Sequence, residues 1–339
     1  MFRNDYSEPA PKEVLEALLK AANEQNVGYG LDMHSDRAAE LIKKAFALKN
    51  NASIHFLAGG TQANMAVISY LLRPYEGVIT VDTGHINVHE TAAVEGSGHK
   101  IFTVPNEDGK LLPEKLEEAI RKHTDEHMMK PKMVYLSDAT ETGTVYQKSE
   151  LRAIKAVCEA YGLYLFIDGA RLGVALTNED NDIRPEDLKD LCDVFYIGGT
   201  KNGALFGEAV VFCDGALGEE FRYHIKNRGA MLAKGFVPGI MFETLFEDGL
   251  YFRLAAHSNA MAKKLREGFC KLNVELVGTG KTNQIFLRLP NQAADLLMDH
   301  FGCELWTPGK NTQVVRVVTS FATREEACDE LLEALKQAL

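Results

Sequence analysis

Cysteines at paired spacing are missing from this sequence. The six cysteines lie apart from one another in apolar stretches, so neither a disulfide framework nor a cysteine-based zinc site is expected. A chain of this kind suits a reducing compartment, and we predict a cytoplasmic protein.

Positive charge is also scarce. Lys and Arg number 37 against 48 Asp and Glu residues, which gives a formal net charge of −11, and no basic run is long enough to offset this locally. Nucleic acid is therefore not an expected partner. No stretch approaches the roughly 20 apolar residues that cross a bilayer, and the first residues form no apolar signal segment, so we expect no membrane contact.

Two nucleotide-binding patterns are absent as well. The glycines never form GxGxxG after a strand, which argues against a nicotinamide cofactor. Residues 278–282, Gly-Thr-Gly-Lys-Thr, resemble part of a P-loop, but Glu275 occupies the position of the required earlier glycine. We predict a turn there.

Short apolar runs alternate with helical patterns over most of the chain. Runs without polar alternation are typical of strands buried on both faces, which indicates a largely parallel sheet covered by helices. The runs occupy residues 54–57, 78–81, 101–104, 133–136, 164–167, 194–197 and 209–212. Before the first run, amphipathic patterns around residues 14–19 and 41–46 predict two helices.

The pattern changes after Gly249. A long helix is predicted at about residues 251–272, strands near 285–289 and 314–319, and a closing helix after Arg324. We therefore predict an α/β protein with a large domain of residues 1–248, which includes the N-terminal segment, and a small α+β domain of residues 249–339.

Two predicted strands end in residues that together suit one cofactor. Asp168 ends an apolar strand, where an isolated carboxylate would be costly without a cationic partner. That partner is either Arg171, in a plain structural ion pair, or a pyridinium nitrogen. Lys201 follows another strand among small residues, a setting that favours Schiff-base chemistry over a surface charge. Lys201 and Asp168 together supply the amine and the acid that pyridoxal phosphate requires.

Two further strand ends offer polar groups. Residues 56–62 run from a strand through two glycines into a helix, whose first amides and the Thr61 hydroxyl could bind a phosphate; alone, they fit a simple tight turn better. His85 follows another strand and is predicted to stack on a cofactor ring. His89 is interpreted as a surface residue, ahead of a metal-binding pair with His85, and we predict no metal site.

Four motifs appear in an order and spacing that resemble one enzyme family. They are Gly-Gly-Thr-Gln-Ala-Asn (59–64), Ala-Thr-Glu-Thr-Gly-Thr-Val-Tyr (139–146), Asp-Gly-Ala-Arg (168–171) and Gly-Gly-Thr-Lys-Asn-Gly (198–203). The chain resembles the low-specificity L-threonine aldolases from Asn4 to about Thr323. This resemblance implies a fold type I pyridoxal-phosphate enzyme: a large domain with a mixed, mostly parallel sheet and a small C-terminal α+β domain.

The resemblance also implies roles for individual residues. Around the cofactor it places Lys201 on the aldehyde, Asp168 on the ring nitrogen, His85 against the ring, and Gly59, Gly60 and Thr61 at the phosphate. Near the ring hydroxyl and the substrate it places Arg171, Arg316, Asn4 and Tyr29. It further implies a homodimer or homotetramer in which Lys226 and Arg228 point towards a neighbouring subunit's phosphate.

One departure concerns the group that handles the substrate hydroxyl. Some family members have a histidine where this chain has Thr140-Glu141-Thr142, so that histidine's role has no counterpart here. A second branch has a histidine before the preceding strand, matched by His127, which becomes a candidate. His85 and a bound water are the alternatives.

The expected reaction is retro-aldol cleavage of L-threonine, L-allo-threonine and related β-hydroxy amino acids to glycine and an aldehyde. A β-eliminating lyase or an aminotransferase would use the same cofactor machinery on the same fold. A catalytically silent ligand-binding protein is a third reading, and the presence of both Lys201 and Asp168 argues against it.

Overall fold

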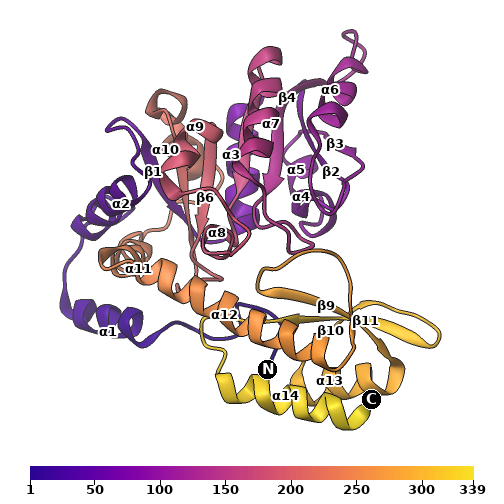
Figure 1. Cartoon of the computed structure of the whole chain (residues 1–339). Coiled ribbons are helices and arrows are strands. Elements are labelled where there is room, and N and C mark those ends of the chain that lie inside the picture. Colours follow the sequence, from indigo (N-terminus) through magenta and orange to yellow (C-terminus); the bar gives the residue numbers. More distant parts are fainter.

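The computed structural model describes residues 1–339 and shows a large domain joined to a smaller one (Figure 1). All seven predicted strands of the large domain are present and form one sheet in the order β1-β7-β6-β5-β4-β2-β3. Only β7 runs antiparallel to its neighbours, so the sheet is mixed and mostly parallel as predicted. The strands are β1 Ser53–Leu57, β2 Glu76–Val81, β3 Ile101–Val104, β4 Lys130–Ser137, β5 Tyr164–Asp168, β6 Val194–Gly198 and β7 Glu208–Phe212.

Alternate side chains of these strands enter two hydrophobic cores, one on each face of the sheet. Ile79 and Val134 belong to one core, whereas their neighbours Val78 and Met133 belong to the other. Both faces are therefore covered, which explains why the strands show apolar runs without polar alternation.

The helices of the large domain cover both faces of the sheet. Residues of α2, α6, α7 and α11 enter the first core, and residues of α3, α5 and α10 enter the second. The helices and 3₁₀ turns are α1 Lys12–Lys20, η1 Ala21–Asn23, α2 Met33–Ala45, α3 Gly60–Leu71, α4 His85–Val88, α5 Ala93–Gly96, α6 Pro113–Arg121, α7 Lys148–Tyr161, α8 Leu172–Leu176, η2 Pro185–Asp187, α9 Leu188–Leu191, η3 Gly215–Gly218, α10 Phe221–Asn227 and α11 Phe236–Glu247.

The small domain contains a four-stranded antiparallel sheet in the order β10-β11-β9-β8. The long helix, both predicted strands and the closing helix are present, and residues 278–282 lie in the loop before β9, as predicted. The elements are α12 Leu250–Lys271, β8 Glu275–Leu276, β9 Gln284–Pro290, α13 Asn291–Phe301, β10 Glu304–Thr307, β11 Thr312–Val318 and α14 Glu325–Ala338.

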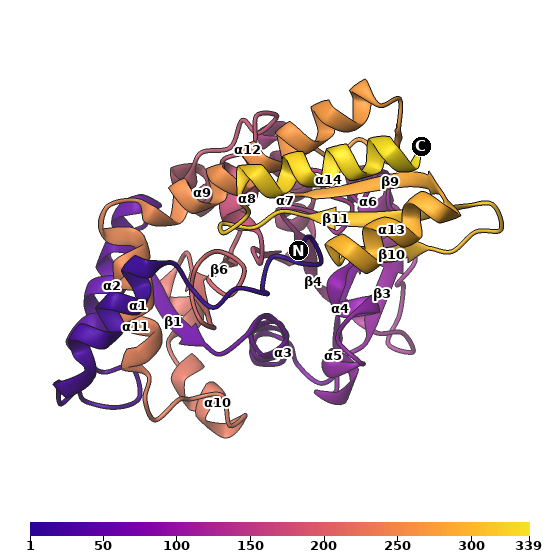
Figure 2. The same cartoon turned by 90° about the horizontal axis from the view of Figure 1, so that it is seen from below.

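The N-terminal segment crosses between the two domains (Figure 2). The backbone of Phe2 bonds to Phe301 and Val318 at 2.8 and 2.9 Å, and its side chain belongs to the small-domain core. The first residues therefore pack with the small domain, although the sequence had grouped them with the large one. No helix combines the length and the apolar character needed to cross a membrane.

Candidate active site

The ends of β5 and β6 bring Asp168 and Lys201 to the same edge of the sheet. Asp168 is the last residue of β5, and Lys201 lies three residues beyond β6. The turns approach so closely that a Cβ on Gly169 would lie 1.9 Å from the Tyr196 carbonyl oxygen, and one on Gly198 would lie 2.2 Å from that of Ala170. The glycines in these two motifs are therefore required by the contact between the two turns.

Asp168 is an ionised carboxylate in the interior. The hydroxyls of Tyr135 and Tyr196 donate to it, Asn64 Nδ2 donates at 2.9 Å, and the Ala170 amide donates at 3.0 Å. Burial acts to raise the pKa of Asp168, but the positive charge of His85 and these donors outweigh it, so the pKa lies below its ordinary value. Arg171 is not its partner.

Lys201 is shifted towards its neutral form. Burial lowers the pKa of Lys201, the charge of Arg171 lowers it further, and attraction to Asp5 and Asp168 only partly compensates. A lysine with a lowered pKa presents more unprotonated amine at neutral pH, which is the form that attacks a carbonyl.

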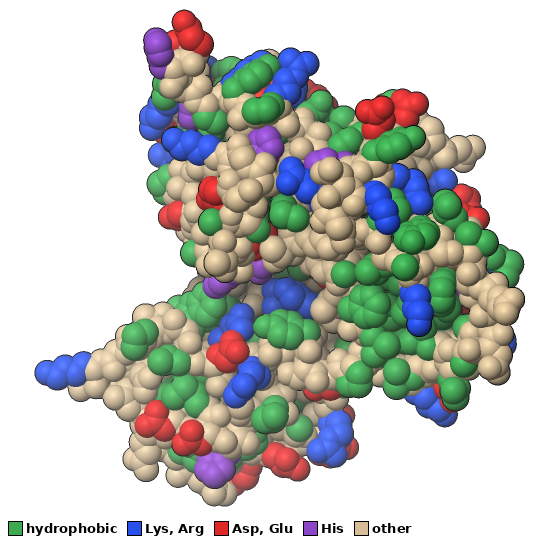
Figure 3. Space-filling view, turned by 180° about the vertical axis from the view of Figure 1, so that it is seen from behind, with side chains coloured by type: hydrophobic (Ala, Val, Ile, Leu, Met, Phe, Trp, Pro, Cys, Tyr) green, Lys and Arg blue, Asp and Glu red, His purple; other side chains and the backbone are tan.

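Lys201 opens into a cavity of about 250 Å³ between the two domains. The large domain contributes loop and helix-end residues, and the small domain contributes residues from β9, β10 and β11. The lining residues are Tyr6, His85, His89, Glu141, Arg171, Lys201, Gln284, Trp306 and Arg316. Figure 3 shows the hollow between the domains, with basic and histidine side chains along it.

His85 begins α4 and belongs to a buried polar chain. Its Nδ1 lies 2.7 Å from Glu90 Oε1, and Asn64 Nδ2 donates to that same oxygen at 2.7 Å as well as to Asp168. Burial acts to lower the pKa of His85, but the Glu90 hydrogen bond and the charges of Asp168 and Glu90 raise it above its ordinary value. His85 is therefore biased towards the protonated, donating form.

His89 borders the same cavity, one turn after His85, with the two ring centroids 5.4 Å apart. Burial lowers the pKa of His89, and the charges of His85, Arg316 and Lys201 lower it further. Its side chain is exposed, as the sequence suggested, but the surface it faces is the cavity.

The two arginines of the cavity differ in how far they are neutralised. Arg171 forms a two-point ion pair with the buried Asp5, through Nε at 2.7 Å and Nη2 at 3.1 Å. Arg316 contacts Glu304 and, at 3.3 Å, Gln284 Oε1, while its Nε is buried without a partner. Nη1 and Nη2 each use one N–H in these contacts, so Arg316 retains a second N–H on each for an anion in the cavity.

Gly59, Gly60 and Thr61 lie where β1 turns into α3. Gly59 precedes the helix and offers no side-chain cap, so the first amides of α3 have no acceptor from it. A Cβ on Gly60 would lie 3.0 Å from the Tyr196 hydroxyl, the same group that donates to Asp168. The turn is thus adjacent to Asp168, and its glycines leave room at the helix N-terminus.

The structure does not bring His127 to the cavity. His127 is exposed in the loop between α6 and β4, before the first residue of β4, whereas the cavity is lined by residues that follow the carboxyl ends of the parallel strands, among them His85, Glu141 and Lys201. Because β4 has eight residues at about 3.3 Å each, the sheet itself separates His127 from Lys201. The prediction that His127 is a candidate base therefore does not hold for the cavity of its own chain.

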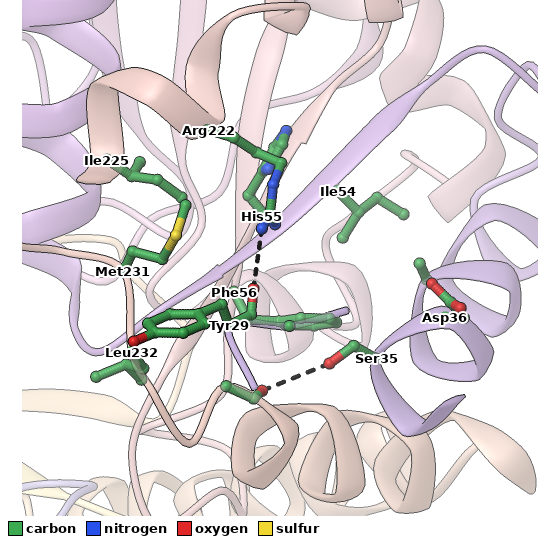
Figure 4. Close-up of a pocket in the computed structure, with 13 residues that line it drawn as sticks. Tyr29, Ser35, Asp36, Ile54, His55, Phe56, Arg222, Ile225, Met231 and Leu232 are labelled. Carbon is green, nitrogen blue, oxygen red and sulfur yellow. Dashed lines mark hydrogen bonds between the residues drawn. The ribbon is translucent and has the colours of Figure 1, made fainter. Parts of the chain in front are cut away.

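Asn4 and Tyr29 also lie outside the cavity. Asn4 Oδ1 accepts from the Tyr6 amide at 3.0 Å and from Ser7 Oγ at 2.9 Å, which fixes the turn that presents Tyr6. Figure 4 shows Tyr29 in a second pocket together with Phe56, Met231 and Leu232. Tyr29 is thus separate from the Lys201 cavity of its own chain, whereas Asn4 precedes Asp5, which pairs with Arg171 of that cavity.

Lys226 and Arg228 lie at the end of α10, on the same side as Tyr29. Lys226 Nζ is 4.8 Å from the centre of the Tyr29 ring. Neither Lys226 nor Arg228 is among the residues that line the Lys201 cavity of the same chain.

Several site residues were missed by the sequence reasoning. Asp5, Asn64, Tyr135 and Tyr196 were missed because their contacts join segments far apart in the chain. The polar groups of Tyr135 and Tyr196 inside otherwise apolar strands were the one signal available. Glu141 was noted only as a departure, although it lines the cavity.

The sequence matches the family model described as beta-eliminating lyase over residues 2–292. It is 35% identical over 297 residues to a low-specificity L-threonine aldolase of a Pseudomonas species, covering 87% of this chain and 85% of that protein. A threonine aldolase structure from Leishmania major superposes with a TM-score of 0.97 at 43% identity, covering 99% of this chain and 98% of that one. Cystalysin from Treponema denticola, described with a pyridoxal 5′-phosphate cofactor, has a TM-score of 0.75 at 15% identity over 99% of this chain and 90% of its own, which shows a shared fold.

Proposed function

The chain belongs to the beta-eliminating lyase family, and we propose that it is a pyridoxal-phosphate-dependent aldehyde-lyase that cleaves L-threonine and L-allo-threonine into glycine and acetaldehyde. The observation behind this proposal is the pairing of a lysine biased towards its neutral form with a buried, ionised aspartate beside an arginine-lined cavity. The names of the relatives favour aldol cleavage over transamination or β-elimination.

The side chains present suit the cofactor. Lys201 offers the amine for its aldehyde, and Asp168 offers a charge for its ring nitrogen, which would replace one of the four donors now bonded to that carboxylate. His85 would lie against the ring, and the turn at Gly59–Gly60 with the free amides of α3 would bind the phosphate. When bound, pyridoxal phosphate supplies a carbonyl for the substrate amine and a ring that accepts an electron pair.

Arg316 is proposed to bind the substrate carboxylate. Its position in the cavity and the remaining N–H groups of Nη1 and Nη2 support this role. Glu304 pairs with Arg316 through Nη2 alone, whereas Asp5 engages Arg171 at two points. A guanidinium fork fixes a carboxylate at two points and so orients the bonds at Cα. Because Arg316 lies on β11, substrate binding would also join the small domain to the large one.

We further propose a homodimer, or a pair of dimers, with active sites near the interface. The exposed apolar side chains of Tyr29, Leu31 and Tyr223 line one open surface pocket of the large domain together with Lys226. Figure 3 shows hydrophobic side chains gathered on one side of the molecule. Lys226 lies against Tyr29 in this pocket. Tyr29, Lys226 and Arg228 would then complete the partner subunit's site. The free state of all six cysteines supports a cytoplasmic location.

Product analysis tests the proposed function. The purified, cofactor-loaded protein is incubated separately with L-threonine, L-allo-threonine and phenylserine, and glycine and the aldehyde are quantified. Equal amounts of glycine and aldehyde are expected, with none from a Lys201→Ala control. Formation of 2-oxobutanoate and ammonia from threonine would instead indicate β-elimination, and absence of turnover would refute the proposal.

A further inference from the structure

One carboxylate lines the cavity, and none of the roles given above uses it. Of the nine lining residues, Glu141 is the single acid. It lies in the loop after β4, at the same edge of the sheet as Asp168 and Lys201.

The two oxygens of Glu141 are in different situations. Oε1 accepts from Ser137 Oγ at 2.6 Å and from the His85 backbone amide at 3.0 Å. No other residue donates a hydrogen bond to Oε2, and unlike Glu90 Oε2 it is not enclosed by protein atoms. The side chain is thus fixed through one oxygen and presents the other to the cavity.

We propose that Glu141 Oε2 accepts the proton of the substrate's β-hydroxyl group during carbon–carbon cleavage, an assignment that rests on the threonine-cleaving function proposed above. Glu141 would then be a catalytic residue of this chain.

The basicity of Glu141 suits this role. Burial raises the pKa of Glu141 above its ordinary value, and the negative charge of Asp168 adds to the effect. Hydrogen bonds from Ser137 and from the residue's own backbone amide, together with the His85 charge, oppose it. A carboxylate with a raised pKa is a stronger base than an ordinary one, and a general base works best when its pKa approaches the working pH.

The other candidate bases are less suitable. His85 is biased towards its protonated form and its Nδ1 is bonded to Glu90, so it can donate a proton more readily than accept one. His89 borders the cavity, but its ring is exposed and packs beside that of His85, whereas Glu141 is fixed through Oε1. Burial and the charge of His85 also lower the pKa of His89. His127 lies at the opposite end of β4.

The proposed step conserves atoms and electrons. The O–H bond breaks, its proton moves to Glu141 Oε2, and its electron pair becomes the carbonyl π bond of the released aldehyde. The Cα–Cβ electron pair stays on the Cα side, for which pyridoxal phosphate, held by Lys201 and Asp168, would supply the electron acceptor. A proton then forms the new Cα–H bond of glycine, and Glu141 gives up its proton, so no net proton is consumed.

Glu141→Gln provides the test, because glutamine has nearly the same shape and its oxygen can still accept from Ser137 and His85. The variant should cleave threonine about 100-fold more slowly or worse, the lower end of what a general base contributes. Exchange of the glycine Cα proton in heavy water uses the same cofactor, Lys201 and Arg316 but involves no hydroxyl. That exchange should remain within about threefold of the native rate if only the hydroxyl step is lost.

A second measurement is made on the protein without its cofactor. In the cofactor-free protein, infrared difference spectra should show a carboxyl that titrates above the ordinary glutamate value of 4.5 and that disappears in Glu141→Gln. The competing base is tested with His89→Asn, for which we expect a threonine cleavage rate within about tenfold of native, because the lost side chain is not the acceptor.

Three results would overturn the assignment. Near-native cleavage by Glu141→Gln would show that another group takes the proton. Equal losses of cleavage and of glycine exchange would show that Glu141 serves a step common to both. A 100-fold loss in His89→Asn alone would move the role to His89. Failure of the native protein to cleave threonine while it exchanges glycine would instead refute the proposed substrate, and the assignment with it.

Discussion

At the scale of single residues, the site depends on burial acting on two charges of opposite sign. Burial penalises both, yet Asp168 remains ionised because hydroxyl and amide donors surround it, whereas Lys201 is moved towards neutrality. The proposed cofactor needs both states, because a charged carboxylate stabilises its protonated ring nitrogen and an uncharged amine attacks its aldehyde.

The attachment of cofactor should therefore follow the titration of Lys201. The reactive form is the neutral amine, whose fraction rises with pH through a pKa that lies below the ordinary 10.5. Mixing cofactor-free protein with pyridoxal phosphate over a pH series should give an attachment rate with its midpoint below 10.5. A midpoint at the ordinary value, or borohydride trapping of the cofactor on a different lysine, would contradict the assignment.

Asp168→Asn should separate cofactor binding from turnover. The amide keeps the size of the side chain but removes the charge that stabilises a protonated, electron-accepting ring. We expect bound cofactor by absorbance, together with a loss of at least about tenfold in kcat at saturating cofactor. Asp299→Asn on the exposed face of α13 is the matched control. Unchanged kcat in Asp168→Asn would remove this role.

Local motifs explain which residues could be predicted. Asp168 and Lys201 each follow an apolar run within a glycine-rich turn, so a window of about seven residues is enough to recognise them. Asp5 could not be found this way, because its partner Arg171 is 166 positions away and the pairing exists only once the N-terminal segment crosses the domain boundary. His127 failed for the converse reason: its sequence neighbourhood gave no indication of which end of β4 it would occupy.

At the scale of elements, β11 positions the arginine that completes the cavity. Arg316 faces Glu304 on β10 and Phe286 on β9 in the sheet register. The strands β9 and β11 were predicted because they are long and apolar. The shorter β8 and β10 were missed, since two or four residues give too short a pattern to detect.

Arg316→Lys should fold normally and bind cofactor but lose at least about tenfold in kcat/KM for threonine. Lysine replaces a planar two-point contact with a point charge, and about 1.4 kcal/mol of transition-state stabilisation corresponds to one decade. Arg288→Lys on the neighbouring β9 is a matched control, because Arg288 is exposed and pairs with Glu275. If Arg316→Lys were near native, Arg171 would become the leading candidate for the substrate carboxylate.

The first residues of the chain pack with the small domain, and Phe2 anchors them there. Its side chain is 1% exposed in the small-domain core, so Phe2→Ala should cost about 3–5 kcal/mol through lost burial and the remaining cavity. The measurement is the urea midpoint of the unfolding transition. Arg3→Ala, at an exposed position, should change the midpoint little. Equal midpoints for the two variants would show that the anchor is dispensable.

At the scale of the whole molecule, one chain contains two groups of predicted site residues that do not meet. Lys201, Asp168, His85 and Arg316 belong to the site between the domains, whereas Tyr29 and Lys226 lie on the apolar side of the large domain. A second copy related by twofold symmetry would present the same apolar surface and could bring these residues to the first copy's site. The sequence of one chain contains no direct signal for such a contact.

Complementation between two impaired variants tests whether the site is shared. Lys201→Ala lacks the reactive amine, and Lys226→Ala lacks the proposed contribution to the partner, so each homodimer should have low activity. In a mixed dimer, the site built on the Lys226→Ala chain has its own Lys201 and receives Lys226 of the partner subunit. Since random mixing of equal amounts makes half of the dimers mixed, each with one intact site, activity should recover to about a quarter of native. Refolding or subunit exchange followed by the threonine assay measures this recovery, with each variant mixed with itself as the control. If the mixture is no more active than the separate variants, Lys226 does not act across a subunit interface.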